Sequence, residues 1–410
     1  MLEHWGFTLP AVLRRHREGP LGAYVDAFAA RLRDQGYVRC TARYQIQLIG
    51  ALGRWLKRQG INAQNLDERL IDHFFRSRRH RRSGDWGTLR ALLKQLHEAG
   101  VIKVPQQRAV DGPFDPIRRA YQKYLETERR LASSTVTSYL HLVHTFLSAR
   151  FGNAKPRFAN LNARDITHFV RCHAPKHSRG RAKLMVTSLR SFFRFLRLQG
   201  EITLDLAACV PTVPNWRQTG LPQALTPQEV KRLLSSCERR THNGQRNFAI
   251  LLLLARLGLR SSEITNLTLE DLDWAAGEIT VEGKSRRRIR LPLPSDAGRA
   301  LADYLRYGRP RCATRRVFVR SVAPHAGFSG SGALASLVRR ALVRAGLNPV
   351  HKGPHLLRHT LATQMLRRGA TLTEIGEILR HRHPDTTAIY AKVDLQRLRI
   401  LTRRWPGGAI

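Results

Sequence analysis

The sequence predicts a mainly α-helical protein with a small β-sheet, in which two tandem helical bundles precede a mixed α/β domain. Three observations support this prediction. Apolar residues recur at helical spacing through most of 21–202, the helical pattern is repeated along the chain, and two β-rich runs flank a glycine-containing turn. We expect the bundles at 1–110 and 111–203, a linker at 204–223 and the mixed domain at 224–410, a division that suits a chain of 410 residues.

The first bundle contains three predicted helices. Residues 42–59 carry an apolar stripe and are followed by a glycine stop signal, and further helices are predicted at 68–76 and 88–98. The segment between the last two helices, 76–84, reads RSRRHRRSG and is either a solvated loop or a contact for phosphate groups. Residues 1–20 are expected to form a short leader before this bundle.

The second bundle repeats the first at nearly constant spacing. Residues 66–75, LDERLIDHFF, match 161–170, LNARDITHFV, 95 positions later. Residues 89–102 match 189–202, now 100 positions later, so the second copy has five additional residues in the loop that includes 178–181. Several matches in the same order indicate a duplicated unit.

The charge of the chain is its clearest functional signal. Lys and Arg number 71 against 30 Asp and Glu, which gives a net charge of +41 and a pI near 11.5. Such a charge favours binding to a polyanion, because neutralised phosphates release counterions; the alternative is a merely basic protein of the ribosomal kind. Each bundle then suits either the clamping of a DNA backbone or the binding of a protein. A hydrophobic fraction of 42% excludes a disordered chain.

No segment predicts export or membrane insertion. The N-terminus lacks the apolar core of a secretory signal, and the longest apolar run, 248–259, is too short to cross a bilayer and contains Arg256. Five scattered cysteines without a C-x-x-C pair favour a reducing compartment. We therefore expect a cytoplasmic protein with no membrane partner.

The mixed domain is expected to open at a capping box. Thr226, Pro227 and Glu229 supply an N-cap, a proline at the first helical position and an acidic third position. A buried helix is expected at 246–257, because it is apolar on most faces.

Arg260 follows that buried helix and precedes another, which is expected to begin at Ser261 or Ser262. A charged side chain at such a junction is usually either paired or functional. Glu263 is the nearest partner, and pairing with it is the structural alternative.

A β-hairpin is expected next. Residues 277–281 and 286–293 are rich in β-forming residues and flank a turn with Lys284 at its tip. A lysine there is either solvated or able to reach a DNA strand and donate a proton. Residues 316–320 are expected to add a third short strand. Two further helices are expected at 334–345 and 371–380.

The stretch 354–393 concentrates groups that handle a phosphodiester. Arg358 matches phosphate oxygens, histidines move protons near neutral pH, and Tyr390 becomes a nucleophile where its surroundings favour the phenolate. His355 and His359 have the i, i+4 spacing of a helical metal pair, but the residue after His355 is Leu instead of the Glu of a zincin. We expect no metal and no cofactor.

Four separated boxes occur in the order GLRSSEITNL, VEGKSRRRIRLPL, HLLRHTLATQML and LRHRHPDTTAIYAKV. Together they resemble the tyrosine recombinases, the family of phage integrases and Xer-type recombinases. The resemblance covers about 114–400 and implies a SAM-like, core-binding helical bundle followed by the catalytic domain. The first bundle is additional to the simplest members, and the resemblance leaves it as a DNA- or protein-binding copy.

The resemblance implies a catalytic set of six residues, namely Arg260, Lys284, His355, Arg358, His381 and Tyr390. The two arginines would grip the scissile phosphate, the lysine would protonate the leaving 5′ oxygen, and the tyrosine would be the nucleophile. His355 is the histidine of the H-x-x-R box, and His381 takes a position that is His or Trp in the family. The hairpin departs from the family pattern, because Ser285 stands where Gly is common.

The implied function is site-specific DNA recombination, of the integrase or transposase type, through a 3′-phosphotyrosyl intermediate without metal or ATP. The implied partners are double-stranded DNA with a specific recombination site and a homo- or hetero-tetramer, the latter with a partner recombinase. The alternatives are a type IB topoisomerase-like enzyme, a catalytically silent DNA-binding regulator on the same fold, and a metal-dependent nuclease.

Overall fold

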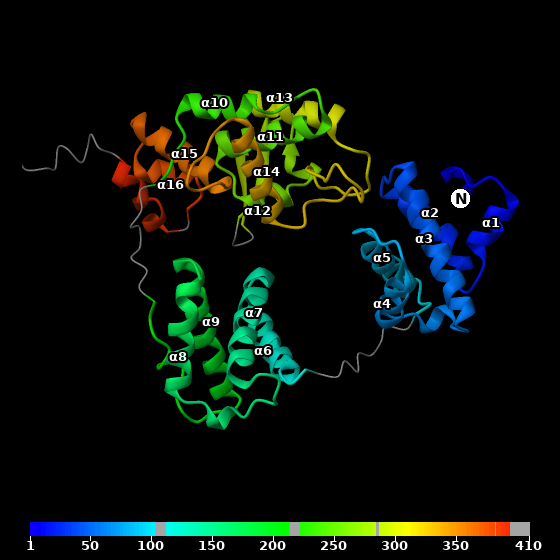
Figure 1. The fold of residues 1–410 in the computed structure, drawn as a ribbon. Helices are drawn as coiled ribbons and strands as arrows, with labels where there is room; N and C mark the ends of the chain where they lie inside the picture. The colour runs from blue at the N-terminus through cyan, green and yellow to red at the C-terminus, as the bar shows by residue number, and fades with distance from the viewer. Residues whose placement is uncertain (103–111, 214–221, 284–286, 382, 394–410) are drawn as a thin grey trace, which may run out of the picture. The chain divides into compact units, whose positions relative to one another are not determined.

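A computed structural model describes residues 1–102, 112–213, 222–283, 287–381 and 383–393 (Figure 1). Backbone contacts divide the chain into two compact units, Met1–Lys103 with Gly220–Ile410, and Val104–Thr219. Separate hydrophobic clusters occupy the first bundle, the second bundle and the C-terminal half. The boundaries 1–110, 111–203, 204–223 and 224–410 stay a prediction.

The first bundle is entirely helical. Its elements are η1 (Leu2–Trp5), α1 (Pro10–Arg17), α2 (Gly22–Asp34), α3 (Arg39–Arg58), η2 (Ala63–Asn65), α4 (Glu68–Ser77) and α5 (Asp85–Glu98). The expectation of a leader at 1–20 is wrong, because Leu2, Trp5 and Phe7 are buried in the core of the bundle. Burial of these large apolar side chains stabilises the segment as part of the bundle, and the indole of Trp5 donates a hydrogen bond to the carbonyl of Ala29 at 3.0 Å.

The second bundle has the same plan. Its elements are α6 (Asp115–Thr127), α7 (Ser133–Phe151), η3 (Phe158–Asn160), α8 (Ala163–His173), η4 (Ala174–Lys176) and α9 (Arg179–Leu198), of which α7 and α9 pack together (Figure 1). The predicted repeat is confirmed: η2 and η3 lie 95 positions apart at both ends, and α4 and α8 begin 95 apart. Both α4 and α8 begin after a residue whose side chain caps the helix, which is Asp67 in the first copy and Asn162 in the second.

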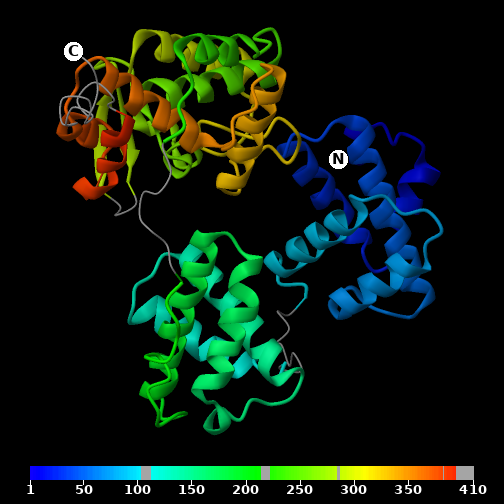
Figure 2. The ribbon, with the colours of Figure 1, turned by 60° about the vertical axis from the view of Figure 1, so that its left-hand side comes forward.

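The C-terminal half is a mixed α/β domain. Its helices are α10 (Pro227–Ser235), α11 (His242–Leu257), α12 (Ser261–Asn266), α13 (Ser295–Asp303), α14 (Ser331–Arg344), α15 (Pro354–Arg367) and α16 (Leu372–Ile378), with short turns of helix at η5 (Leu269–Asp271), η6 (Tyr304–Gly308), η7 (Pro384–Thr386) and η8 (Ala388–Val393). The predicted capping box at Thr226 is confirmed, with Glu229 as its acidic member. Figure 2 shows α15 and α16, which are in contact, from a second direction.

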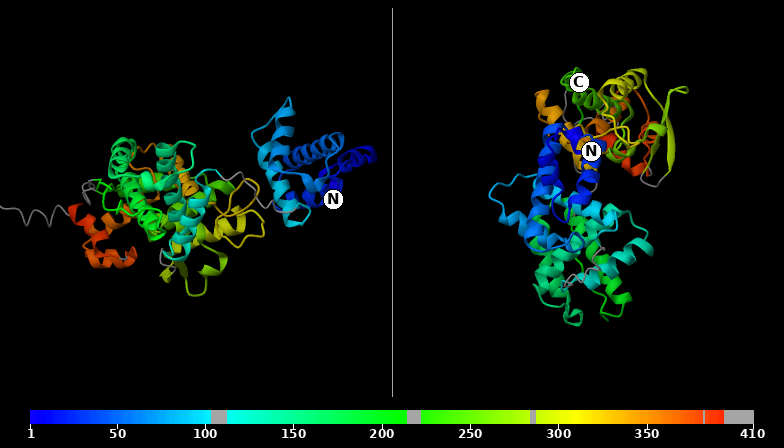
Figure 3. Two further views of the ribbon diagram at one scale, coloured as in Figure 1. Left: turned by 90° about the horizontal axis from the view of Figure 1, so that it is seen from below. Right: turned by 90° about the vertical axis from the view of Figure 1, so that its right-hand side faces the viewer.

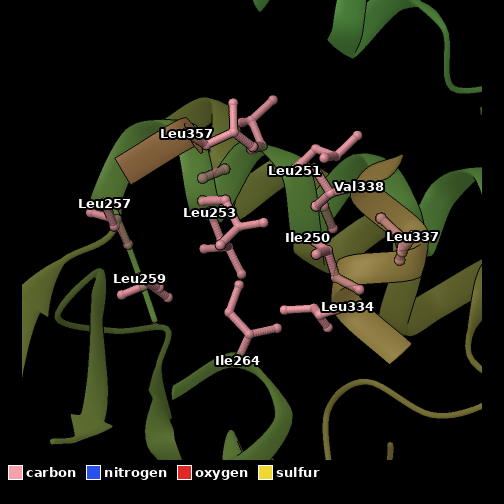
Figure 4. Packing of buried hydrophobic residues seen from close by; sticks show 14 of the residues in the cluster. Ile250, Leu251, Leu253, Leu257, Leu259, Ile264, Leu334, Leu337, Val338 and Leu357 are labelled. Atoms are coloured by element: carbon pink, nitrogen blue, oxygen red, sulfur yellow. The ribbon is translucent and has the colours of Figure 1, made fainter. Parts of the chain in front are cut away.

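The core of this domain forms around α11. Leu251 and Leu253 of α11 are fully buried and belong to one cluster with Leu334 of α14 and Leu357 of α15 (Figure 4). A helix that is apolar on most faces can be stable only when other elements cover it on several sides. The central position of α11 therefore follows from its sequence, and it fixes the place of whatever follows its C-terminus.

The sheet has three antiparallel strands in the order β1 (Leu272–Asp273), β2 (Glu278–Glu282), β3 (Arg288–Pro292). The predicted hairpin is confirmed as β2 and β3, whose ribbon is drawn in Figure 3. In the register of these strands, Ile279 lies opposite Leu291. The expected third strand at 316–320 is wrong, since this segment makes only isolated bridges outside the sheet. Val317, Phe318 and Val319 are all buried, and a run of consecutive buried residues packs into the core instead of alternating between two faces.

None of the helices in the described parts of the chain has both the length and the apolar character needed to cross a bilayer.

Candidate active site

Two left-handed backbone positions shape the candidate site. Gly258 ends α11 with φ 55°, and Arg380 follows α16 with φ 56°. A Cβ atom on Gly258 would lie 2.7 Å from a methyl group of Leu379, so glycine permits the close approach of these two helix ends. The carbonyl groups exposed at both ends become acceptors for the arginines of the site.

Arg358 of α15 bridges the two helix ends from a buried position. Its guanidinium donates to the carbonyl of Gly258 at 2.6 Å and to the carbonyl of Leu379. Burial lowers the pKa of Arg358 to about 10, and the positive charges of Arg260 and Arg380 act in the same direction. The side chain therefore remains cationic at neutral pH, although it is almost removed from solvent.

Arg260, which follows α11, is held by hydrogen bonds to α12 and to the backbone after α16. It donates to the carboxylate of Glu263 at 2.8 Å and to the carbonyl of Arg380 at 2.8 Å. The expected pairing with Glu263 is thus present, together with a second contact across 120 positions of the chain. Because an arginine has five N–H donors, Arg260 and Arg358 each keep three that make no hydrogen bond within the described residues.

Arg380 is a site residue that the sequence reasoning missed. Its side chain is 5% exposed, and it donates to Glu263 at 3.0 Å, so one fully buried carboxylate accepts from two arginines. A buried carboxylate is stable only when it is paired and hydrogen-bonded, and this one has both. The only signal in the sequence is an arginine directly before His381, where it looks like one more surface charge.

Tyr390 is buried in the site, and its hydroxyl has a histidine partner. The residue is 1% exposed, and its hydroxyl lies 2.8 Å from Nδ1 of His359. Burial raises the pKa of Tyr390 to about 12, against the opposing effect of the Arg358 charge. The pKa of His359 is lowered, first by burial and then by the charges of His355 and Arg358. A neutral imidazole therefore faces a protonated phenol at neutral pH.

From the sequence, His359 is a candidate only for metal binding, and its contact with Tyr390 is not predicted. The one feature of the sequence that points to a role in the site is its position one helical turn after His355 on α15. In the parts of the chain that the structure describes, no three His, Cys, Asp or Glu side chains are grouped as ligands of a metal ion would be.

The two predicted histidines lie beside the arginines. The pKa of His355 is lowered by loss of hydration and then by the charges of Arg358 and Arg260. Burial and the same two arginines lower the pKa of His381 to about 4, and its Nδ1 lies 2.7 Å from the hydroxyl of Thr387. Both imidazoles are therefore neutral at pH 7, and each can donate one hydrogen bond.

The structure brings five of the six predicted residues into one electrostatic environment, since the charge of Arg358 acts on His355, His381 and Tyr390. Lys284, the sixth, lies outside the described residues. The assembled site offers free guanidinium donors for an anion, neutral imidazoles and one phenol. Such a set can bind a phosphodiester and transfer it to the phenol oxygen.

Comparison with known proteins decides the family. The C-terminal half matches the model of the phage integrase family over residues 223–397, and the second bundle matches the phage integrase N-terminal SAM-like domain over 119–200. A protein of Sinorhizobium fredii that carries the name integrase/recombinase y4rA is 45% identical over 401 residues, which cover 97% of each chain. This chain belongs to the phage integrase family of tyrosine recombinases. The resemblance found in the four sequence boxes is thereby confirmed, and so is the enzyme class, which cuts and rejoins DNA strands.

Other relatives and structures agree with this family. The tyrosine recombinase XerC of Oceanobacillus iheyensis is 31% identical over 292 residues, which cover 68% of this chain and 92% of that protein. The fold resembles that of the XerH recombinase bound to its difH substrate, with a TM-score of 0.54, 21% identity and coverage of 69% and 83% of the two chains. It also resembles a λ integrase dimer on a core site, with a TM-score of 0.52, 18% identity and coverage of 71% and 97%. The fold prediction is thus confirmed: a SAM-like bundle followed by a mixed α/β catalytic domain.

Proposed function

We propose that this protein is a site-specific recombinase that cuts and rejoins duplex DNA through a covalent ester between Tyr390 and a 3′ phosphate, without metal or ATP. The observation that carries the proposal is the hydrogen bond between Tyr390 and His359 beside two arginines with free donors. The XerH recombinase and the λ integrase, which share the fold, are bound to recombination-site DNA in their solved structures, which supports DNA as the substrate.

In the proposed first step the Tyr390 hydroxyl gives its proton to Nδ1 of His359, and its oxygen forms a bond to phosphorus. The bond from phosphorus to the 5′ oxygen breaks, and that oxygen receives a proton from Lys284, the role implied by the resemblance. The negative charge that develops on the non-bridging oxygens is stabilised by Arg260 and Arg358, at about 2.7–4 kcal/mol for each well-placed donor.

His355 and His381 complete the proposed set by donating hydrogen bonds to the same oxygens. Their pKa values are both lowered, so they stabilise the charge as neutral donors at pH 7. Rejoining reverses the first step, with the 5′ hydroxyl of another strand as the attacking group, so the ester conserves the energy of the broken bond and no nucleotide is needed.

Two duplexes and four strand exchanges require four active sites, so we propose a tetramer on DNA, made of this chain alone or together with a partner recombinase. XerC and XerD recombinases are among its relatives, which supports both arrangements. We also propose that the protein acts in the cytoplasm, where the DNA of a bacterial cell lies.

Covalent trapping tests the function. The protein is mixed with fragmented DNA of its source in the presence of a chelator, the mixture is denatured, and the ends of the DNA that stays bound to protein are sequenced. Tyr390→Phe is expected to yield no adducts. Tyr307→Phe is the matched control, since it removes a hydroxyl from an exposed tyrosine of the same domain and should leave the adducts unchanged.

Adducts at one or a few sites, lost only in Tyr390→Phe, would support the proposal. Adducts spread evenly over the DNA would indicate a topoisomerase instead. Tight DNA binding without adducts would favour the silent regulator. DNA cleavage that leaves no adducts and occurs only when the chelator is omitted would indicate a metal-dependent nuclease. Either of these last two results would overturn the mechanism.

A further inference from the structure

The end of α4 and the loop that joins it to α5, together called the loop below, are strongly basic. Residues 76–84 contain five arginines and one histidine. The carboxylates that pair with this loop are Asp72, which lies 2.7 Å from Arg76, and Asp85, which lies 2.8 Å from Arg78. Five positive charges less two negative charges leave +3 on a short segment whose arginines are mostly exposed.

A buried carboxylate orders this loop. Asp85 is 1% exposed and accepts hydrogen bonds from the Tyr44 hydroxyl at 2.8 and 3.0 Å, from Arg78 at 2.8 Å and from the backbone N–H of Arg82 at 3.1 Å. Burial of a carboxylate costs free energy unless all its acceptor sites are used, and here they tie both ends of the loop to α3 and α5. The loop is therefore held in one conformation from inside the bundle.

Two further arginines of the loop, Arg81 and Arg82, lie over aromatic rings. Arg82 stacks on Tyr44, with its guanidinium carbon 4.0 Å from the ring centre. Arg81 lies 5.3 Å from the ring centre of Phe75 and donates to the carbonyl of Arg76 at 2.6 Å. Arg79 is exposed and makes no ion pair within the described residues. Preorganised cations bind a ligand with less loss of side-chain entropy than flexible ones do.

Comparison of the two duplicated bundles shows that the buried carboxylate of Asp85 is present in the first copy and not in the second. At the offset of 100 positions, Asp85 corresponds to Met185, which is 1% exposed in the core of the second bundle. The first copy therefore has a charged group at a core position where an apolar side chain would be more stable. In the second copy, Arg179 and Arg181 are exposed in the first turn of α9, at the place where the two copies differ in length by five residues.

We propose that the Asp85-ordered loop, residues 76–84, is a second binding site for the sugar-phosphate backbone of duplex DNA, separate from the catalytic domain. Guanidinium groups match phosphate oxygens bidentately, whereas contacts with phosphate carry no information about base sequence. The site therefore adds affinity and positions the DNA without selecting the cleaved sequence. The inference rests on the proposed function only for the choice of DNA as the polyanion.

Salt-dependent DNA binding tests this site in the full-length protein. A fluorescent duplex of arbitrary sequence is titrated at several salt concentrations with Tyr390→Phe, so that no covalent step interferes, and with the same protein carrying Arg79→Ala and Arg82→Ala. Neither change removes Arg78 or Arg81, which hold the loop. Each lost phosphate contact lowers the slope of log affinity against log salt by about 0.9, so we expect a decrease of about 1 to 2.

The matched control carries Arg33→Ala and Lys57→Ala. It removes the same charge from the same bundle, at exposed residues that pair with Asp34 and Glu18. The control should keep the slope of the parent, and circular dichroism should show that both variants are folded. An unchanged slope in the loop variant, or an equal decrease in both, would overturn the proposal.

The adduct experiment separates this inference from the proposed function. With Tyr390 intact, the loop variant should form a smaller amount of covalent adduct than the wild type, at the same positions in the DNA. A wild-type protein that forms no adducts would refute the recombinase mechanism, whereas the salt slopes would still decide the loop site. A loop variant that cuts at new positions would refute a backbone contact, because such a contact does not read sequence.

Discussion

At the scale of single residues, the site consists of groups whose protonation is set by burial and by neighbouring cations. The pKa of Arg358 is lowered and that of Tyr390 is raised, yet both keep their ordinary neutral-pH forms. The pKa values of His355, His359 and His381 are all lowered, so these rings are neutral at pH 7 and the arginines carry the positive charge of the site. Tyr390, the proposed nucleophile, then needs a proton acceptor, and His359 is in hydrogen-bond contact with it.

His359→Asn tests that role through the pH dependence of cleavage. Removal of a general base lowers a rate by about 10²–10⁴-fold, and we expect a loss in that range for single-turnover adduct formation. In the proposed mechanism the neutral form of His359 is the active one, and its pKa is lowered from the ordinary value of about 6.5. The wild-type rate should therefore be flat between about pH 7 and pH 8 and fall only below about pH 6.5, a fall that the variant lacks.

His383→Asn is the control for this experiment, because His383 is exposed in the turn before Pro384. It should retain both the rate and the acid limb of the wild type. If His359→Asn also retained them, another group would be the proton acceptor.

At the scale of elements, the site depends on how three helix ends meet. The C-terminus of α11, the C-terminus of α16 and the N-terminal half of α15 are joined by Arg358, whose two acceptors belong to the first two. Gly258 permits this meeting because it has φ 55° and because its missing side chain leaves room for Leu379 and Leu361. The glycine that ends α11 therefore also supplies the backbone carbonyl that holds Arg358, one of the proposed catalytic residues.

Gly258→Ala is expected to damage stability and activity together. The left-handed backbone costs an alanine about 1–2 kcal/mol, and overpacking against Leu379 and Leu361 costs about 1–3 kcal/mol more. Thermal unfolding and the rate of adduct formation measure the two effects. Gly277→Ala is the control, because Gly277 has φ 65° with no atom within 4 Å of the added Cβ, so only the backbone term applies. Equal losses of stability in both variants would contradict the packing argument.

At the scale of the whole molecule, the chain combines a net charge of +41 with separate hydrophobic cores. The positive charge favours binding to a polyanion, while each hydrophobic core stabilises the fold of its own part of the chain. Division into several cores is typical of chains longer than about 250–300 residues. The predicted domain boundaries lead to a direct test of how independent these parts are.

Calorimetry should show more than one unfolding transition, each sensitive to its own core. Phe192→Ala in the second bundle should cost about 3–5 kcal/mol and lower one transition, because Phe192 is fully buried there. Leu253→Ala in the catalytic domain should cost about 2–5 kcal/mol and lower a different one. Val343→Ala, at an exposed position, should shift neither. A single transition that moves in both core variants would refute the division into these domains.

The sequence by itself determined the features that depend on neighbouring residues. Helical periodicity, the capping box at Thr226, the hairpin around residue 283 and the duplication all follow from local patterns, and the four boxes were enough to indicate the family. Five of the six predicted site residues lie in one electrostatic environment in the structure, as the resemblance of the boxes to the family implies.

Only the tertiary structure decided which side chains meet. The contact of His359 with Tyr390 joins residues 31 positions apart, and that of Arg380 with Glu263 joins residues 117 apart. Neither can be read from spacing, because the first depends on how η8 packs against α15, and the second depends on where Arg380, after α16, lies relative to α12. The same reason explains the two errors: burial of Trp5 and of Phe318 depends on cores formed by distant segments, whereas a local pattern records only how apolar a residue is.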